Sequence, residues 1–170
     1  ASGDLVRVGK SLADGKLTAV TFDDILALGK TFDMVFIEAD GAKGKPLKYP
    51  APHEPVIPPF SDMIFVVAGL DSLWKPINEK VFRWELLAKK SGLGRDEMIS
   101  PELFGHFFTS DMLLKDVERK ICTIVLNKYD TLVQRKAALE IAKTIILQTG
   151  VKSIIVSSTV FHIFYEIRQL

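Results

Sequence analysis

Four short apolar runs dominate the pattern of hydrophobic and polar residues along the chain. They occupy residues 33–39, 62–69, 120–127 and 152–158. Each run is nearly continuous in β-branched or large apolar residues instead of alternating with polar ones, which is typical of strands covered on both faces. The long gaps between the runs suit the crossovers that parallel strands need. The pattern therefore predicts an α/β fold with a mostly parallel sheet, in which ligands bind at the carboxyl ends of the strands.

Helical periodicity fills the gaps between these runs. Residues 21–32 form a candidate helix with Thr21 or Asp23 near its start. Residues 79–115 predict two or three helices, broken at the sequences Ser-Gly-Leu-Gly and Ile-Ser-Pro. The clearest helix is predicted over 131–150, because apolar residues recur there at helical spacing and a glycine follows where a C-terminal cap belongs.

The two ends of the chain carry weaker signals. Residues 4–9 and 16–21 are candidate strands around a tight turn. The tail, residues 159–170, fits the helical and strand periods about equally, and we predict a helix there.

Composition places the chain among ordinary globular domains. Its 170 residues are 48% hydrophobic and 25% charged, which predicts one α/β domain over residues 1–170. A net charge of +1 gives no reason to expect a nucleic acid or an anionic membrane as partner. The longest uncharged apolar run is far shorter than a membrane span. A single cysteine, Cys122, cannot form an internal disulfide, which fits a cytoplasmic location.

A tetrapeptide of the form Asn-Lys-x-Asp follows the third apolar run, at Asn127, Lys128 and Asp130. An ionised Asp can accept hydrogen bonds from the ring N–H and the exocyclic amine of guanine, a pair of donors that adenine does not offer. The Asn can reach N7 of the base, and the stem of the Lys can lie along the ring face. Alternatively, Asp130 caps the following helix and Asn127 merely ends the strand. Ser157 and Ser158 end the next apolar run, where either a second base-contacting loop or a plain polar turn would lie.

An acidic loop follows the first apolar run. Glu38 and Asp40 stand at the predicted carboxyl end of the strand, where two carboxylates can hold Mg²⁺ directly or through water. Gly41 and Gly44 would let the backbone approach a phosphate, and three lysines would balance its charge, Lys43, Lys45 and Lys48. These residues suit the phosphate side of a nucleotide hydrolase. The alternative is an acidic strand end followed by a solvated basic turn.

A proline-rich loop comes next. Six of the eight prolines lie between Pro46 and Pro59, so this loop can hold a fixed shape without regular secondary structure. It carries His53 and Glu54, which could act as a general acid/base pair because histidine titrates near neutral pH. A packed or surface role for both is the alternative.

A phosphate-binding loop of the form Gly-x-x-x-x-Gly-Lys-Ser/Thr is missing from the chain. The nearest match runs from Gly3 to Ser11, but five residues separate its glycines instead of four, and they form a candidate strand. We therefore reject it.

The acidic loop, the proline loop, the sequence VVAGLDSLWKPINEKVFR and the Asn-Lys-x-Asp motif occur in an order that resembles the YqeC-type family of accessory proteins for selenium-dependent molybdenum hydroxylases. The resemblance covers about residues 16–158. It implies a three-layer fold like that of P-loop NTPases and a nucleotide-dependent role in maturing these enzymes or their cofactor, with GTP and Mg²⁺ as expected cofactors. Matched to this chain, the family's acidic loop, proline loop and base-recognition motif fall on the residues already named. The family's downstream arginine falls on Arg83.

Two departures from the family pattern matter. The family begins with a strand and a glycine-rich phosphate loop, whereas this chain starts after that point, either as the later part of a longer domain or as a version without the loop. Phe82 stands before Arg83 where the family tends to have histidine. We therefore expect this chain alone to bind triphosphates poorly and to be inactive as a GTPase.

Three hypotheses follow. The first is a guanine-nucleotide-binding accessory protein, a GTPase when complete, whose partner is a molybdenum hydroxylase or its cofactor. The alternative is a non-enzymatic interaction module with a vestigial nucleotide pocket. A third is an enzyme that acts on a selenium or sulfur species through His53 and Glu54, for which Cys122 is the one cysteine available.

Overall fold

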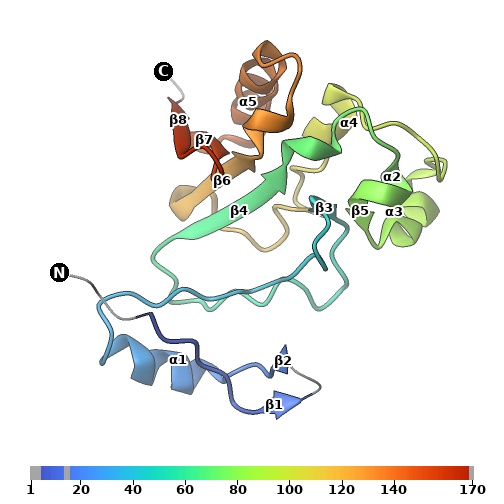
Figure 1. Ribbon diagram of the computed structural model, residues 1–170. Helices are drawn as coiled ribbons and strands as arrows, with labels where there is room; N and C mark the ends of the chain where they lie inside the picture. The colour runs from blue at the N-terminus through green and yellow to red at the C-terminus, as the bar shows by residue number, and fades with distance from the viewer. Residues whose placement is uncertain (1–4, 14–15, 169–170) are drawn as a thin grey trace. The chain divides into compact units, whose positions relative to one another are not determined.

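The computed structural model describes residues 5–13 and 16–168 (Figure 1). The chain divides into two compact units, Ala1–Glu38 and Ala39–Leu170. The expectation of one nucleotide-binding-like domain over residues 1–170 stays a prediction.

The first unit contains a short hairpin and one helix. Strands β1 (Leu12–Ala13) and β2 (Lys16–Leu17) pair antiparallel, and the turn between them lies outside the described residues. Helix α1 (Phe22–Gly29) is confirmed, with Thr21 as its cap. The Asp24 N–H donates to Thr21 Oγ1 at 3.2 Å, and the Thr21 N–H donates to the Asp24 carboxylate at 2.9 Å. The strand predicted over 4–9 is wrong for residues 5–9, which are irregular.

The strand predicted over residues 33–39 is also wrong. These residues form no regular element, and the side chains of Met34 and Phe36 are 69% and 77% exposed. Of the described backbone groups in this stretch, the Ala39 carbonyl is the one that accepts a backbone hydrogen bond, from Val56 at 3.3 Å. Strand propensity reflects how side chains pack in a paired sheet, so an apolar run that finds no neighbouring strand does not become one.

A four-stranded sheet forms the centre of the second unit, and its strand order is β4-β6-β7-β8. The strands are β4 (Ile64–Gly69), β6 (Cys122–Asn127), β7 (Ser153–Ser158) and β8 (Ile163–Arg168). The first three are parallel and match predicted strands, whereas β8 runs antiparallel to β7. The α/β class with a mostly parallel sheet is therefore confirmed, while the likeness to P-loop NTPases stays a prediction.

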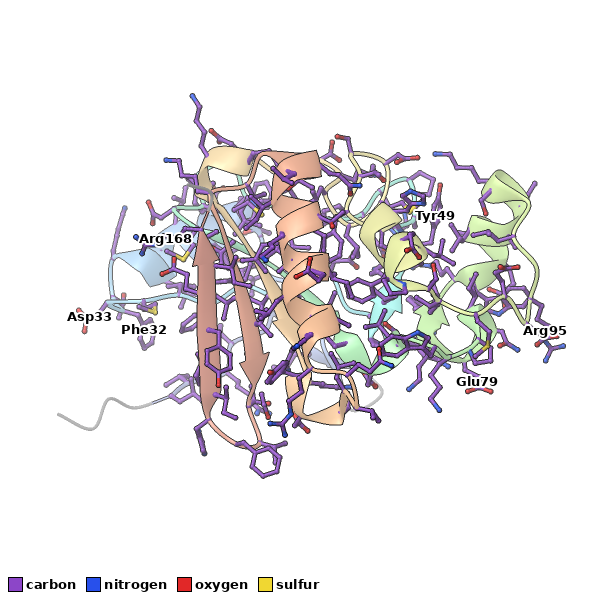
Figure 2. All side chains as sticks on the ribbon, turned by 90° about the horizontal axis from the view of Figure 1, so that it is seen from above. Phe32, Asp33, Tyr49, Glu79, Arg95 and Arg168 are labelled. Carbon is purple, nitrogen blue, oxygen red and sulfur yellow. The ribbon has the colours of Figure 1, made fainter. Side chains whose placement is uncertain are left out.

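Helix α5 (Lys136–Thr149) lies along one face of this sheet (Figure 2). Its buried stripe matches the predicted one: Ala138, Ile141, Ala142, Ile145 and Ile146. The helix ends as predicted at Gly150, whose φ of +68° is a left-handed conformation that glycine adopts at low cost. It begins later than predicted, because a 3₁₀ turn, η3 (Tyr129–Thr131), follows β6.

The opposite face of the sheet departs from the expectation of strands covered on both sides. Val66 and Ala68 of β4 are buried, but Phe65 and Val67 between them are 48% and 58% exposed. Within the described residues, β4 therefore alternates between a buried and an open side, although its sequence is apolar throughout.

The helix predicted for the tail is wrong, because residues 163–168 form strand β8. The tail sequence fits both periods, so local propensity does not decide between them. The open edge of β7 decides, because all six residues of β8 pair with it, from Ser153 opposite Arg168 to Ser158 opposite Ile163.

Between β4 and β6 the chain forms short helices, as expected. They are α2 (Ile77–Lys80), α3 (Trp84–Ser91) and α4 (Pro101–His106), with breaks at the two predicted sequences. A small parallel pair, β3 (Leu47–Lys48) with β5 (Val81–Phe82), joins the proline loop to this region, and in Figure 1 these two strands lie beside α2 and α3. Figure 2 shows Glu79 and Arg95 pointing outward from the same region. None of the helices in the described part of the chain is long and apolar enough to cross a membrane.

Candidate functional site

The Asn-Lys-x-Asp motif lies at the carboxyl ends of the parallel strands, as predicted. Asn127 ends β6, and its Oδ1 accepts a hydrogen bond from Ser157 Oγ of β7 at 3.2 Å. The parallel register of β6 and β7 puts these residues side by side. Lys128 follows with a φ of +63°, a left-handed conformation that is unusual outside glycine. Its Nζ donates to Asp71 Oδ2 at 3.1 Å.

Asp130 lies in η3 and does not cap α5, which begins at Lys136, so that part of the alternative interpretation is wrong. Its carboxylate is half-buried and has no hydrogen bond or ion pair to any residue that the structure describes. Ser158 is fully buried, and its Oγ accepts a hydrogen bond from the Phe161 N–H at 3.3 Å. Asp130 therefore keeps the acceptors that a guanine base would need, whereas Ser158 supports the turn after β7.

Lys48 is the centre of a second cluster, formed by the acidic and proline loops. It lies at the end of β3, and its side chain is 7% exposed. Its ammonium donates to the Asp40 carboxylate, to the Gly41 carbonyl at 3.0 Å and to Glu54 Oε2 at 2.9 Å. All three protons of the lysine ammonium are therefore used, and one buried cation is shared by two carboxylates.

Arg83 completes this cluster from the start of α3. Its guanidinium makes a two-pronged contact with Glu54, in which Nη2 donates to Oε1 at 2.9 Å and Nη1 donates to Oε2. The residue has a φ of +61°, so the backbone takes a left-handed conformation directly before the helix. The ring of Phe82 lies beside three cations, at 4.5 Å from Arg83, 5.2 Å from Lys43 and 5.7 Å from Lys48.

The charge state of Glu54 follows from these contacts. The hydrogen bonds from Arg83 hold the pKa of the Glu54 carboxyl well below its usual range, with the Lys48 ammonium and the Ala51 N–H acting in the same direction. Reciprocally, Glu54 raises the pKa of Arg83. The backbone of the proline loop is held by Lys115, whose Nζ donates to the carbonyls of Pro52 and Glu54 at 2.6 Å each.

Other residues of the predicted site take no part in the hydrogen bonds of this cluster. Glu38 belongs to the first unit, is exposed and has no polar partner among residues 5–13 and 16–168. The side chain of His53 is 78% exposed, and its Nε2 lies 3.9 Å from Glu54 Oε1, too far for a hydrogen bond. The acid/base pair is therefore not assembled in this structure. Gly44, with a φ of +76°, forms the turn beside Lys43.

A magnesium site at Glu38 and Asp40 stays a prediction. The described residues include no group of three or more His, Cys, Asp or Glu side chains placed to hold a metal ion. Lys48 occupies the Asp40 carboxylate that a cation would use. Cys122 is buried, and burial raises the pKa of its thiol to about 11, so it does not support the third hypothesis, an enzyme acting on selenium or sulfur.

Sequence reasoning did not single out two residues of these clusters. Asp71 holds the lysine of the base-recognition motif, and Lys115 anchors the proline loop. Asp71 stands within the VVAGLDSLWKP sequence that carries part of the family resemblance, two residues after a predicted strand, which was a usable signal. Nothing in the local sequence marks Lys115, whose contacts lie more than 60 residues away in the chain.

Comparison with known proteins identifies the family. The model of the YqeC protein family matches residues 1–85, which is half of the chain. The chain belongs to the YqeC family. It is 40% identical over 85 residues to an uncharacterised YqeC protein of Escherichia coli strain K12. That alignment covers 48% of this chain and 33% of the relative, so the chain spans about a third of the relative's length. No solved structure matches the chain.

The match to the YqeC family includes the acidic loop, the proline loop and Arg83. The base-recognition motif at Asn127–Asp130 lies beyond the matched residues. The two groups are therefore supported by different observations. Family membership and geometry support the Lys48 cluster, whereas motif chemistry and geometry support the base-recognition motif.

Proposed function

We propose that this YqeC-family protein is a guanine-nucleotide-binding accessory protein in the maturation of selenium-dependent molybdenum hydroxylases or their cofactor, acting in the cytoplasm. The nucleotide-binding part of this proposal rests on the arrangement of Asn127 and Asp130. Asn127 is tied to Ser157 of the neighbouring strand, while the Asp130 carboxylate has no partner among the described residues.

The chemistry of this edge suits a purine base. Asp130 can accept two hydrogen bonds from guanine, and such bonds to a charged acceptor contribute about 1.5–3 kcal/mol each. The Asn127–Ser157 hydrogen bond holds the motif against the end of β7, so the loop is ordered before a ligand arrives. The carboxyl ends of parallel strands are also where ligands bind in α/β folds.

The phosphate side of the proposal rests on the acidic loop. GTP with Mg²⁺ is the expected ligand, and the sequence assigns the ion to Glu38 and Asp40, directly or through water, of which Asp40 would first have to release Lys48. Lys43 lies exposed in the turn before Gly44 and would face a phosphate. The maturation role comes from the family resemblance.

One observation favours a non-enzymatic alternative. Asp40 and Glu54 are already neutralised by Lys48 and Arg83, and the proline loop is fixed by Lys115. Such a cluster suits a rigid loop that docks a partner protein. In this alternative, the molybdenum hydroxylase would contact the exposed His53 side of the loop, and the nucleotide pocket would be vestigial.

The deciding experiment is a titration of the protein with GMP and AMP by NMR, followed by GDP, GTP and ATP with Mg²⁺ by calorimetry. The mononucleotides isolate the base from the phosphate contacts that this chain is expected to lack. We expect GMP to bind at least tenfold more tightly than AMP, since one charge-assisted hydrogen bond is enough for that factor.

Asp130→Asn provides the sharpest variant. The side-chain amide of the variant donates a hydrogen bond where the carboxylate accepts one. The variant should therefore bind GMP more weakly and bind xanthosine monophosphate, whose C2 carries a carbonyl, more tightly. Asp62→Asn, at an exposed residue without a partner in the described chain, is the matched control. Equal binding of GMP and AMP, or no binding of either, would reject the nucleotide proposal and favour the docking alternative.

A further inference from the structure

Asp71 binds two lysines at the end of β4, and the proposed function does not use it. It lies in the 3₁₀ turn η1 (Leu70–Ser72), directly after β4, and η1 packs beside η3. The side chain is 20% exposed. Its Oδ2 accepts from Lys128 at 3.1 Å and from Lys80 at 3.3 Å, so one carboxylate oxygen holds two ammonium groups from separate segments.

The carboxylate is held tightly at the end of β4. Its other oxygen, Oδ1, is buried and has no hydrogen-bond partner in the described residues. A methyl group added at Gly69 would come within 2.5 Å of this Oδ1 and 2.6 Å of Pro46 Cβ. Gly69 therefore leaves the space that the carboxylate fills.

The two lysines differ in what they can do. Lys80 is the last residue of α2 and is 23% exposed, so it belongs to the packed side of the pair. Lys128 is 44% exposed and is the lysine of the base-recognition motif. A free lysine side chain populates many rotamers, and ordering it opposes binding; an ion pair formed in advance removes part of that penalty.

We propose that Asp71 is the positioning residue of the base-recognition loop, fixing the Lys128 ammonium so that its stem is ordered where a purine ring would lie. This inference rests on the proposed function. It assigns Asp71 and Asp130 different tasks: Asp130 distinguishes guanine from adenine, whereas Asp71 acts through Lys128, whose stem packs against any purine.

The first test needs no nucleotide. Lysine amines are labelled with a limiting amount of acetylating reagent, and the rate at each site is read by mass spectrometry. In Asp71→Asn, which keeps the shape of the side chain, Lys128 should react about threefold faster, the scale expected for a partly exposed ion pair. Lys90 of α3, paired with Asp111, is the internal control and should not change.

Lys80→Met is the matched variant. It removes the competing ammonium and leaves Asp71 to Lys128 alone, so labelling of Lys128 should stay the same or slow down. If Lys80→Met accelerates Lys128 as Asp71→Asn does, the effect is a general loosening of the region and the inference is overturned. Unchanged labelling of Lys128 in Asp71→Asn overturns it as well.

The second test separates this inference from the proposed function. In NMR titrations, Asp71→Asn should weaken the binding of GMP and of AMP by the same factor, roughly tenfold. The ratio of the two dissociation constants should stay unchanged. Asp130→Asn should change the ratio. If the wild-type protein binds GMP and Asp71→Asn binds it equally well, the positioning role is wrong. If the wild-type protein binds no purine nucleotide, the proposed function fails, and the labelling rates alone decide whether Asp71 fixes Lys128.

Discussion

At the scale of single residues, Glu54 is where the acidic and proline loops meet. It accepts hydrogen bonds from Arg83 and Lys48, and also from the Ala51 N–H at 3.2 Å, while its side chain is 17% exposed. Removing one member of such a largely buried group leaves the others as uncompensated charges, which costs more than the group contributes in total. The stability of the proline loop should therefore depend on the charge of Glu54.

The first prediction concerns Glu54→Gln and its dependence on pH. At pH 7 the free energy of unfolding of this variant should be about 3 kcal/mol lower than that of the wild type, because Arg83 loses its counter-charge and Lys48 keeps only Asp40. The pKa of Glu54 is depressed in the folded state, so its stabilisation is fully present above the unfolded value near 4.5 and is lost as the pH falls below it. The difference in free energy of unfolding between the wild type and the variant should therefore shrink as the pH falls below that value.

Urea unfolding between pH 7 and pH 3, followed by the fluorescence of Trp74 and Trp84, measures this difference in the second unit. The same substitution at Glu79, whose side chain points outward in Figure 2, is the control and should cost less than about 0.5 kcal/mol at every pH. A difference that stays constant from pH 7 to pH 3 would contradict the assignment of the effect to the Glu54 charge.

At the scale of elements, the start of α3 shows how the chain aims a side chain. Arg83 has a φ of +61°, a conformation that costs most residues about 1–2 kcal/mol, and the helix begins at the next residue. The contact with Glu54 compensates for this backbone strain. Sequence reasoning connected Arg83 to the site by family resemblance, but no local pattern shows that a non-glycine residue adopts a left-handed conformation there.

The second prediction compares Arg83→Gly with Arg83→Ala. Both variants lose the contact with Glu54, but glycine relieves the left-handed strain, so Arg83→Gly should be about 1 kcal/mol more stable than Arg83→Ala. The same pair of substitutions at Glu85, in the first turn of α3, should give the opposite order by a similar amount. Urea unfolding of the four variants measures both differences. An alanine that is equal to or better than glycine at position 83 would show that the conformation is not strained in solution.

Elements were predictable where local pattern and pairing agree. The sequences of β4, β6 and β7 have strand character, and each finds a parallel neighbour; α1 and α5 have both an apolar stripe and a capping residue. The run over 33–39 has the same strand character without a neighbour among the described residues, and β8 has a neighbour without a decisive pattern. The missing information in both cases is the pairing, which a local pattern does not contain.

At the scale of the whole chain, the predicted site residues fall into groups that sequence order alone could not separate. Asn127 and Ser157 meet because β6 and β7 are parallel, which the strand pattern did predict. Lys115 and Asp71 bring in contacts across more than 50 residues, and these depend on how loops pack. Motif chemistry thus located the edge of the sheet, but only the folded chain shows which charges are already paired.

The last prediction tests the arrangement of the sheet in the second unit. Val66 and Val67 are neighbours on β4, yet Val66 is 9% exposed on the α5 side and Val67 is 58% exposed on the other. Val66→Ala should lower the free energy of unfolding by about 2 kcal/mol, whereas Val67→Ala should lower it by less than about 0.5 kcal/mol. Tryptophan fluorescence in urea measures both. Because the strand is apolar on both sides, its sequence favours equal costs. Equal losses would mean that the second face of β4 is covered in solution, whereas unequal losses would show that β4 buries one face and leaves the other open.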